Sequence, residues 1–105
     1  MTSARALTAA DLGLDGTDAI VQGTMRVKGG RALVKVDYLG SEKGLGTAGL
    51  KAFGRLKEAA KAEGATSLRI ETSPIIESSG RLRTILGKQG FQSRPNGTMF
   101  YEGGL

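Results

Sequence analysis

The chain has 105 residues, enough for one domain with a single hydrophobic core. It contains no Cys and no His, which excludes disulfides, thiolate nucleophiles, His-based catalytic triads and the usual zinc sites. An enzyme of this composition must use carboxylates, Tyr, Ser/Thr, Lys/Arg, backbone dipoles or a cofactor that carries the reactive group.

The net charge is 15 − 10 = +5, which favours a nucleic acid, an acidic protein or a polyanionic cofactor as partner. The basic residues are dispersed, with two Tyr, three Phe and no Trp to interleave with them. This pattern favours a solvated surface with a few anion-binding positions over a nucleic-acid face. No apolar run approaches the about 20 residues that span a bilayer, and residues 1–10 lack a signal-peptide stretch, so we expect a cytoplasmic protein, or one delivered by a carrier, without a membrane partner. We expect no metal site, since the chain lacks Cys and His.

The first 18 residues read as a short lead-in, with a possible helical turn at 8–11. The alternation from Ala19 to Lys28 predicts a strand, and Lys28-Gly29-Gly30-Arg31 predicts a two-residue hairpin turn. The return strand, 31–39, alternates between two faces. We expect Ala32, Val34, Val36 and Tyr38 on one face, and Leu33, Lys35, Asp37 and Leu39 on the other.

A glycine-punctuated turn over 40–46, a helix over about 47–63 and a strand over 66–72 complete a βαβ unit with a right-handed crossover. Glycines at the start of a helix let backbone N–H groups turn toward a ligand, so this turn predicts an anion site. Gly49 and Gly54 lie inside the helix and predict a close approach of its backbone to the sheet or to a ligand.

After Pro74, we expect a second helix that begins at Ser78 or Ser79 and stops at Gly90. A terminal hairpin turns at 95–97, between strands over 91–94 and 98–102. The expected fold is a single α+β domain over 1–105, with a core at 19–102. It has αβα-type layers, a mixed sheet with an antiparallel hairpin leading into the βαβ unit, two main helices and a C-terminal hairpin.

The order of elements, the Gly44-Leu45-Gly46 turn, the strand Ala65–Ser73 and the run Lys88-Gln89-Gly90-Phe91 together resemble the GNAT superfamily of N-acetyltransferases. The likeness covers about 19–101. It implies that acetyl-CoA is bound, with its pyrophosphate in the glycine turn and its pantetheine arm along the preceding strand, which splays from its parallel neighbour.

Carried over residue by residue, the resemblance implies a phosphate cradle made of Lys43, Gly44, Leu45, Gly46 and Thr47. It implies that the backbone of Val36, Asp37, Tyr38 and Leu39 faces the pantetheine arm, and that Ser79 occupies a position where the family often has Asn. Arg81 and Arg83 are candidates for cofactor phosphates, with a solvated helix face as the alternative. Ser41 replaces the motif's opening Arg/Gln, and Leu86 replaces a Tyr that often acts as the acid.

The candidate general bases are Glu71, at the end of a strand, and Glu77, in the loop after it. For both, a solvated or salt-bridged surface carboxylate is the alternative. Tyr38 and Tyr101 are the two phenols that can serve as leaving-group acid, with a core or edge-strand role as the alternative.

Two functions remain open. The first is an acetyl-CoA-dependent N-acetyltransferase that acts on an amine, expected to belong to a protein or another macromolecule. The second is a catalytically degenerate GNAT-like domain that binds a protein or a nucleic acid, as a toxin, inhibitor or regulatory module. Either can be a monomer or a homodimer.

Overall fold

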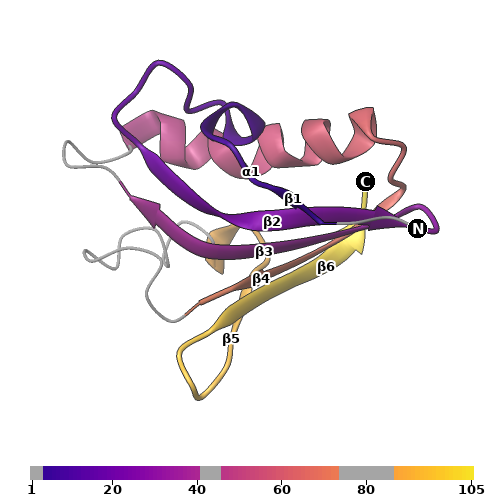
Figure 1. Cartoon of the computed structure of the whole chain (residues 1–105). Helices are drawn as coiled ribbons and strands as arrows, with labels where there is room; N and C mark the ends of the chain where they lie inside the picture. The colour runs from indigo at the N-terminus through magenta and orange to yellow at the C-terminus, as the bar shows by residue number, and fades with distance from the viewer. Residues whose placement is uncertain (1–3, 41–45, 74–86) are drawn as a thin grey trace.

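The computed structural model describes residues 4–40, 46–73 and 87–105, with no side chains described for 46–50. This part of the chain is a small α+β domain in which a mixed six-stranded sheet is covered on one side by a helix (Figure 1). The elements are β1 Arg5–Ala6, the 3-10 helix η1 Ala9–Leu12, β2 Ile20–Lys28, β3 Arg31–Gly40, α1 Gly46–Ala62, β4 Ser67–Thr72, β5 Gln92–Ser93 and β6 Met99–Gly104.

The strand order is β1-β2-β3-β4-β6-β5, and within it β3 and β4 are the parallel pair. The predicted hairpin, the βαβ unit and the terminal hairpin are therefore confirmed. The lead-in carries more structure than expected, because β1 pairs with β2 and adds a sixth strand. The predicted second helix falls largely on residues 74–86, outside the described residues.

The core lies between α1 and the sheet. Leu56 and Ala60 of α1 are buried above Leu68 and Ile70 of β4, and Met25 of β2 is buried beside them. Figure 1 shows that η1 lies on the same side of the sheet as α1. The lead-in contributes Leu7, Leu12 and Leu14 to the same core.

The N-terminal segment is anchored by a charged cluster. Thr8 and Asp11 form a capping box at the start of η1. The guanidinium of Arg5 donates to both carboxylate oxygens of Asp11 at 2.9 Å, and it also donates to Glu63 beyond the end of α1 at 2.6 Å. These bonds join β1, η1 and the C-terminal end of α1.

Gly54 does not make the close backbone approach that was predicted for it. A Cβ added at this position would meet nothing within 4 Å, and the residue is exposed on the outer side of α1. The prediction was wrong here because a single glycine inside a helix is tolerated when packing of the opposite face holds the helix. The surroundings of Gly49 fall outside the described part of the structure.

Candidate functional site at the end of strand β3

Strand β3 runs past the end of its parallel neighbour. The β3–β4 pairing extends from Arg31↔Ser67 to Val36↔Thr72, and then Ser73 donates its N–H to the Val36 carbonyl at 2.9 Å. The Ser73 hydroxyl donates to the Asp37 carbonyl at 2.6 Å. Residues 38–40 of β3 continue beyond this point and are paired with β2. Within the described ranges no strand pairs with the last three residues of β3 on the β4 side, so these residues line a step in the sheet.

A β-bulge lies immediately before this step. In the β2–β3 register Gly23 is opposite Val36 while Gln22 is opposite Tyr38, so Asp37 is an extra residue on β3. An extra residue moves the following side chains to the other face of the sheet. For this reason Leu39 is buried in the core, whereas simple alternation predicted it on the face of Lys35.

The backbone of Leu39 is directed toward the side of β3 where β4 has ended. Lys28 and Arg31 flank a two-residue turn and form a hydrogen-bonded pair. Hydrogen-bonded and non-hydrogen-bonded pairs alternate along an antiparallel ladder, so every second residue of β2, counted from Lys28, belongs to a hydrogen-bonded pair. The pair Val21↔Leu39 falls between two such positions. The N–H and C=O of Leu39 thus point away from β2, to the side of β3 on which the described residues provide no partner strand at this position.

The chain leaves β3 at Gly40 and enters α1 at Gly46, so the end of the strand and the first turn of the helix are joined by a short segment. The N-terminus of a helix carries a partial positive charge that favours phosphate. Gly46 and Thr47 lie in this first turn. The predicted cradle residues Lys43, Gly44 and Leu45 lie outside the described residues, as do Glu77, Ser79, Arg81 and Arg83.

Tyr38 lies on the sheet face opposite α1, half-buried, with its ring along the strand over Gly40. A Cβ on Gly40 would be 2.6 Å from the phenol oxygen of Tyr38. Because Gly40 has no Cβ, the ring of Tyr38 can lie over it. The phenol of Tyr38 lies beside the step, on the same strand as Leu39.

Tyr101 is part of an aromatic cluster between α1 and the sheet. Its ring centroid is 4.7 Å from that of Phe53 and 5.5 Å from that of Phe91, and Phe53 and Phe91 are 5.3 Å apart. The ammonium of Lys57 lies over both Phe53 and Tyr101. These contacts agree with the core role that was the alternative for Tyr101.

Glu71 is held by two arginines. Arg94 donates to the two carboxylate oxygens of Glu71 at 2.5 and 3.0 Å, and Arg69 donates at 2.7 Å. Hydrogen bonds from Arg94 and then Arg69 lower the pKa of Glu71 to about 2. A carboxylate with so low a pKa is a weak proton acceptor near neutral pH. The salt-bridged role, which was the alternative for Glu71, is the one its contacts show.

The bulge and the glycine that permits it were missed by the analysis of the sequence. A Cβ on Gly23 would lie 2.1 Å from the carbonyl oxygen of Lys35, so the two backbones approach each other closely just before Asp37. An isolated glycine inside a strand pattern is itself a signal for a bulge or a close backbone contact. Gly23 was therefore the residue that could have located the site.

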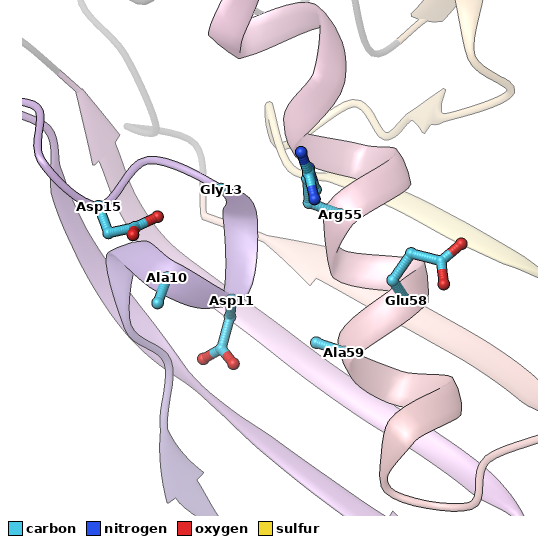
Figure 2. A pocket seen from close by; sticks show the side chains of 7 residues that line it. All are labelled: Ala10, Asp11, Gly13, Asp15, Arg55, Glu58 and Ala59. Carbon is cyan, nitrogen blue, oxygen red and sulfur yellow. The ribbon is translucent and has the colours of Figure 1, made fainter.

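A separate hollow of about 580 Å³ lies between η1 and α1 (Figure 2). Its charged lining consists of Asp11, Asp15, Glu58 and Arg55, and Asp11 is already bound by Arg5. Glu58 points away from the Asp15 side of the hollow in Figure 2. The lining groups do not converge on one point, and no residue of β3 takes part.

No protein-family model, curated protein or solved structure matches the chain. In the described ranges no helix has the length and hydropathy needed to cross a membrane. The same ranges contain no group of three or more Asp or Glu side chains that could hold a metal ion. The function must therefore be argued from the geometry at the end of β3.

Proposed function

We propose that the chain is an acetyl-CoA-dependent N-acetyltransferase that acts on an amine of a protein or another macromolecule. The observation that carries the proposal is the step in the sheet, where β3 runs past its parallel neighbour and the backbone of Leu39 is directed away from β2. An arm that contains amides can pair with such a backbone as an added strand does. The first turn of α1 follows a few residues later and suits the phosphates of the same ligand.

The residues of the chain would bind and orient the ligand. Leu39 would pair with the pantetheine amides, and the segment from Lys43 to Thr47 would hold the pyrophosphate through backbone N–H groups. The bound acetyl-CoA supplies a thioester whose carbonyl carbon accepts the amine nitrogen, and the C–S bond breaks to release the CoA thiol. Holding the two reactants together accounts for much of the rate enhancement in a reaction of this kind.

Proton transfer would depend on the groups beside the step. Tyr38 is the candidate acid whose phenol lies on β3 itself, next to Leu39. We do not assign Glu71 as the base, because Arg94 and Arg69 hold it as an ion-paired carboxylate. Tyr101 packs in the aromatic cluster and is not assigned a catalytic role.

Calorimetric titration with acetyl-CoA tests the proposal. We expect micromolar binding by the wild-type chain and at least tenfold weaker binding by Gly46→Glu, since its carboxylate would repel the phosphates. An acidic residue in the first turn of a helix is favourable for the helix, so the variant should still fold. Gly54→Glu makes the same change in the middle of α1, in open space, and should bind within twofold of wild type. Absence of binding by the wild type would overturn the proposal.

A second candidate is a domain of the same fold that has lost catalysis and binds a partner. It is favoured by the contacts of Glu71 and Tyr101, which engage two of the four candidate catalytic side chains in structural interactions. Incubation with acetyl-CoA and a mixture of peptides with free amines, followed by mass spectrometry, separates the two candidates. Acetyl-CoA binding without any acetylated product would favour the second.

A further inference from the structure

The face of the sheet opposite α1 presents a regular array of polar and charged side chains. Strand register places Arg26, Leu33, Arg69 and Glu102 in one row across β2, β3, β4 and β6, and Thr24, Lys35, Glu71 and Phe100 in the next row. The alternate residues of the same strands, such as Val34 and Ile70, are buried against α1. We call this opposite side the open face.

The open face is accessible to solvent. The side chains of Lys35, Asp37 and Glu102 are 67%, 50% and 49% exposed, and Arg69 in the middle of the sheet is 31% exposed. A stable covering layer would reduce these values strongly. Among the described residues, no layer covers this face, which leaves these side chains available for contact with another molecule.

Positive charge predominates on the open face. Among the described residues its cations are Arg26, Lys28, Arg31, Lys35, Arg69 and Arg94, and its anions are Asp37, Glu71 and Glu102, so these side chains carry a net charge of 6 − 3 = +3. The charge of the whole chain is +5. More than half of the excess positive charge thus lies on one side of the sheet, an arrangement that attracts a polyanion.

Ion pairs arrange the β4–β6 half of this face. Arg31 and Arg69 both bind Glu102, and Arg69 and Arg94 both bind Glu71. Exposed ion pairs contribute little stability, so phosphate groups can compete for these arginines. On the β2–β3 half, Arg26 and Lys28 form no ion pair within the described ranges, and Lys35 has a 3.7 Å contact with Asp37.

Two partly exposed aromatic rings lie on this face, and one of them, Phe100, contacts its cations. Phe100 of β6 lies 4.3 Å from the guanidinium carbon of Arg94 and 5.8 Å from that of Arg69, measured to the ring centroid. Tyr38 of β3 is half-buried on the same face. Aromatic and guanidinium planes on a sheet are surfaces on which bases stack, and stacking requires bases that are not paired in a duplex.

We propose that the open face binds single-stranded nucleic acid, with phosphates on the cations of β2 and β3 and bases against Phe100 and its arginines. An acidic protein would use the cations but gain little from the rings. A duplex would meet a sheet of side chains, and the described part of the chain has no element on this face that enters a groove. This inference does not rest on the proposed acetyltransferase activity.

Fluorescence anisotropy with labelled 20-nucleotide dT and rU oligomers tests the proposal on the full chain. We expect binding whose affinity falls steeply as salt rises, because phosphate contacts release counterions. Arg26→Glu with Lys35→Glu should weaken binding at least tenfold. Lys51→Glu with Lys61→Glu changes the net charge equally on the outer side of α1, where both residues are exposed, and should weaken it less than threefold.

Phe100→Leu tests stacking while keeping an apolar side chain in the sheet, and we expect at least fivefold weaker binding. Thermal unfolding of each variant shows that the fold is retained. Equal losses in the two double variants would overturn the proposal, since net charge alone would then explain binding. Duplex of the same length binding as tightly as the single strand, or complete displacement of the oligomer by an equal concentration of polyglutamate, would overturn it too. Acetyl-CoA should not displace the oligomer.

Discussion

Gly23 and the carbonyl of Lys35 are so close that a Cβ on Gly23 would lie 2.1 Å from the Lys35 oxygen. The obstacle is backbone, which cannot move aside as the end of a flexible side chain can. This contact brings β2 against β3 immediately before the bulge at Asp37. The bulge in turn sets the direction of Leu39, so a single glycine supports the whole candidate site.

Gly23→Ala should therefore lower the free energy of unfolding by about 2–3 kcal/mol, since the strands must separate locally. Urea unfolding followed by circular dichroism measures the change. Gly54→Ala is the control, because it adds a methyl group in open space within a helix and should raise stability by about 0.5–1 kcal/mol. A neutral Gly23→Ala would show that the bulge can relax without cost.

Glu71 should make stability depend on acidity. Its pKa is about 2 in the folded protein and 4.5 as the ordinary value, so its contribution is present above pH 4.5 and is lost as the pH falls toward 2. The carboxylate is one third exposed, so solvent screening reduces the contribution. Between pH 5 and pH 2.5 the free energy of unfolding should fall in both proteins, and the fall should be about 0.5–1 kcal/mol smaller for Glu71→Gln than for the wild type.

Urea unfolding across this pH range provides the measurement. Glu58→Gln is the matched control, because Glu58 forms no ion pair in the described ranges and the same charge is removed. If the free energy of unfolding depends on pH in the same way in both variants, the ion pairs of Glu71 do not contribute to the pH dependence of stability.

The aromatic cluster should tolerate loss of the Tyr101 hydroxyl but not loss of a ring. Phe53→Ala should cost about 3–5 kcal/mol, because it leaves a cavity beside Phe91 and Tyr101. Tyr101→Phe retains the ring contacts and should change stability by less than about 0.5 kcal/mol. It should also keep acetyl transfer within twofold of wild type. A much larger loss of activity with unchanged stability would restore Tyr101 as a catalytic acid.

Asp11→Asn should loosen the N-terminal segment. The variant loses the charge that accepts two hydrogen bonds from Arg5 and weakens the capping box with Thr8. We expect a loss of about 1–2 kcal/mol, measured by urea unfolding. Glu63→Gln removes the more exposed partner of Arg5 and should cost no more than about 0.5 kcal/mol. Equal effects would mean that Asp11 holds Arg5 no more strongly than Glu63 does.

The sequence by itself determined the central architecture of the domain. The Gly29-Gly30 turn, the period-two pattern of 31–36 and the three- and four-residue spacing in α1 are local signals, because each reports which side of one element is buried. Pairing of β3 with β4 followed from the length of the helical crossover. The composition alone also limits the reactive groups, because a chain without Cys and His has only carboxylates, hydroxyls, basic side chains and a bound cofactor to use.

The tertiary structure decided what happens where elements meet. The bulge at Asp37 depends on the approach of Gly23 to Lys35, twelve positions along the chain, and it reversed the predicted face of Leu39. Arg69 precedes Glu71 by two residues on β4, but Arg94, the larger cause of the lowered pKa, comes from the segment after β5, and local spacing does not reveal it. Contacts between distant segments set these features, and a periodic pattern records burial but not the partner across the sheet.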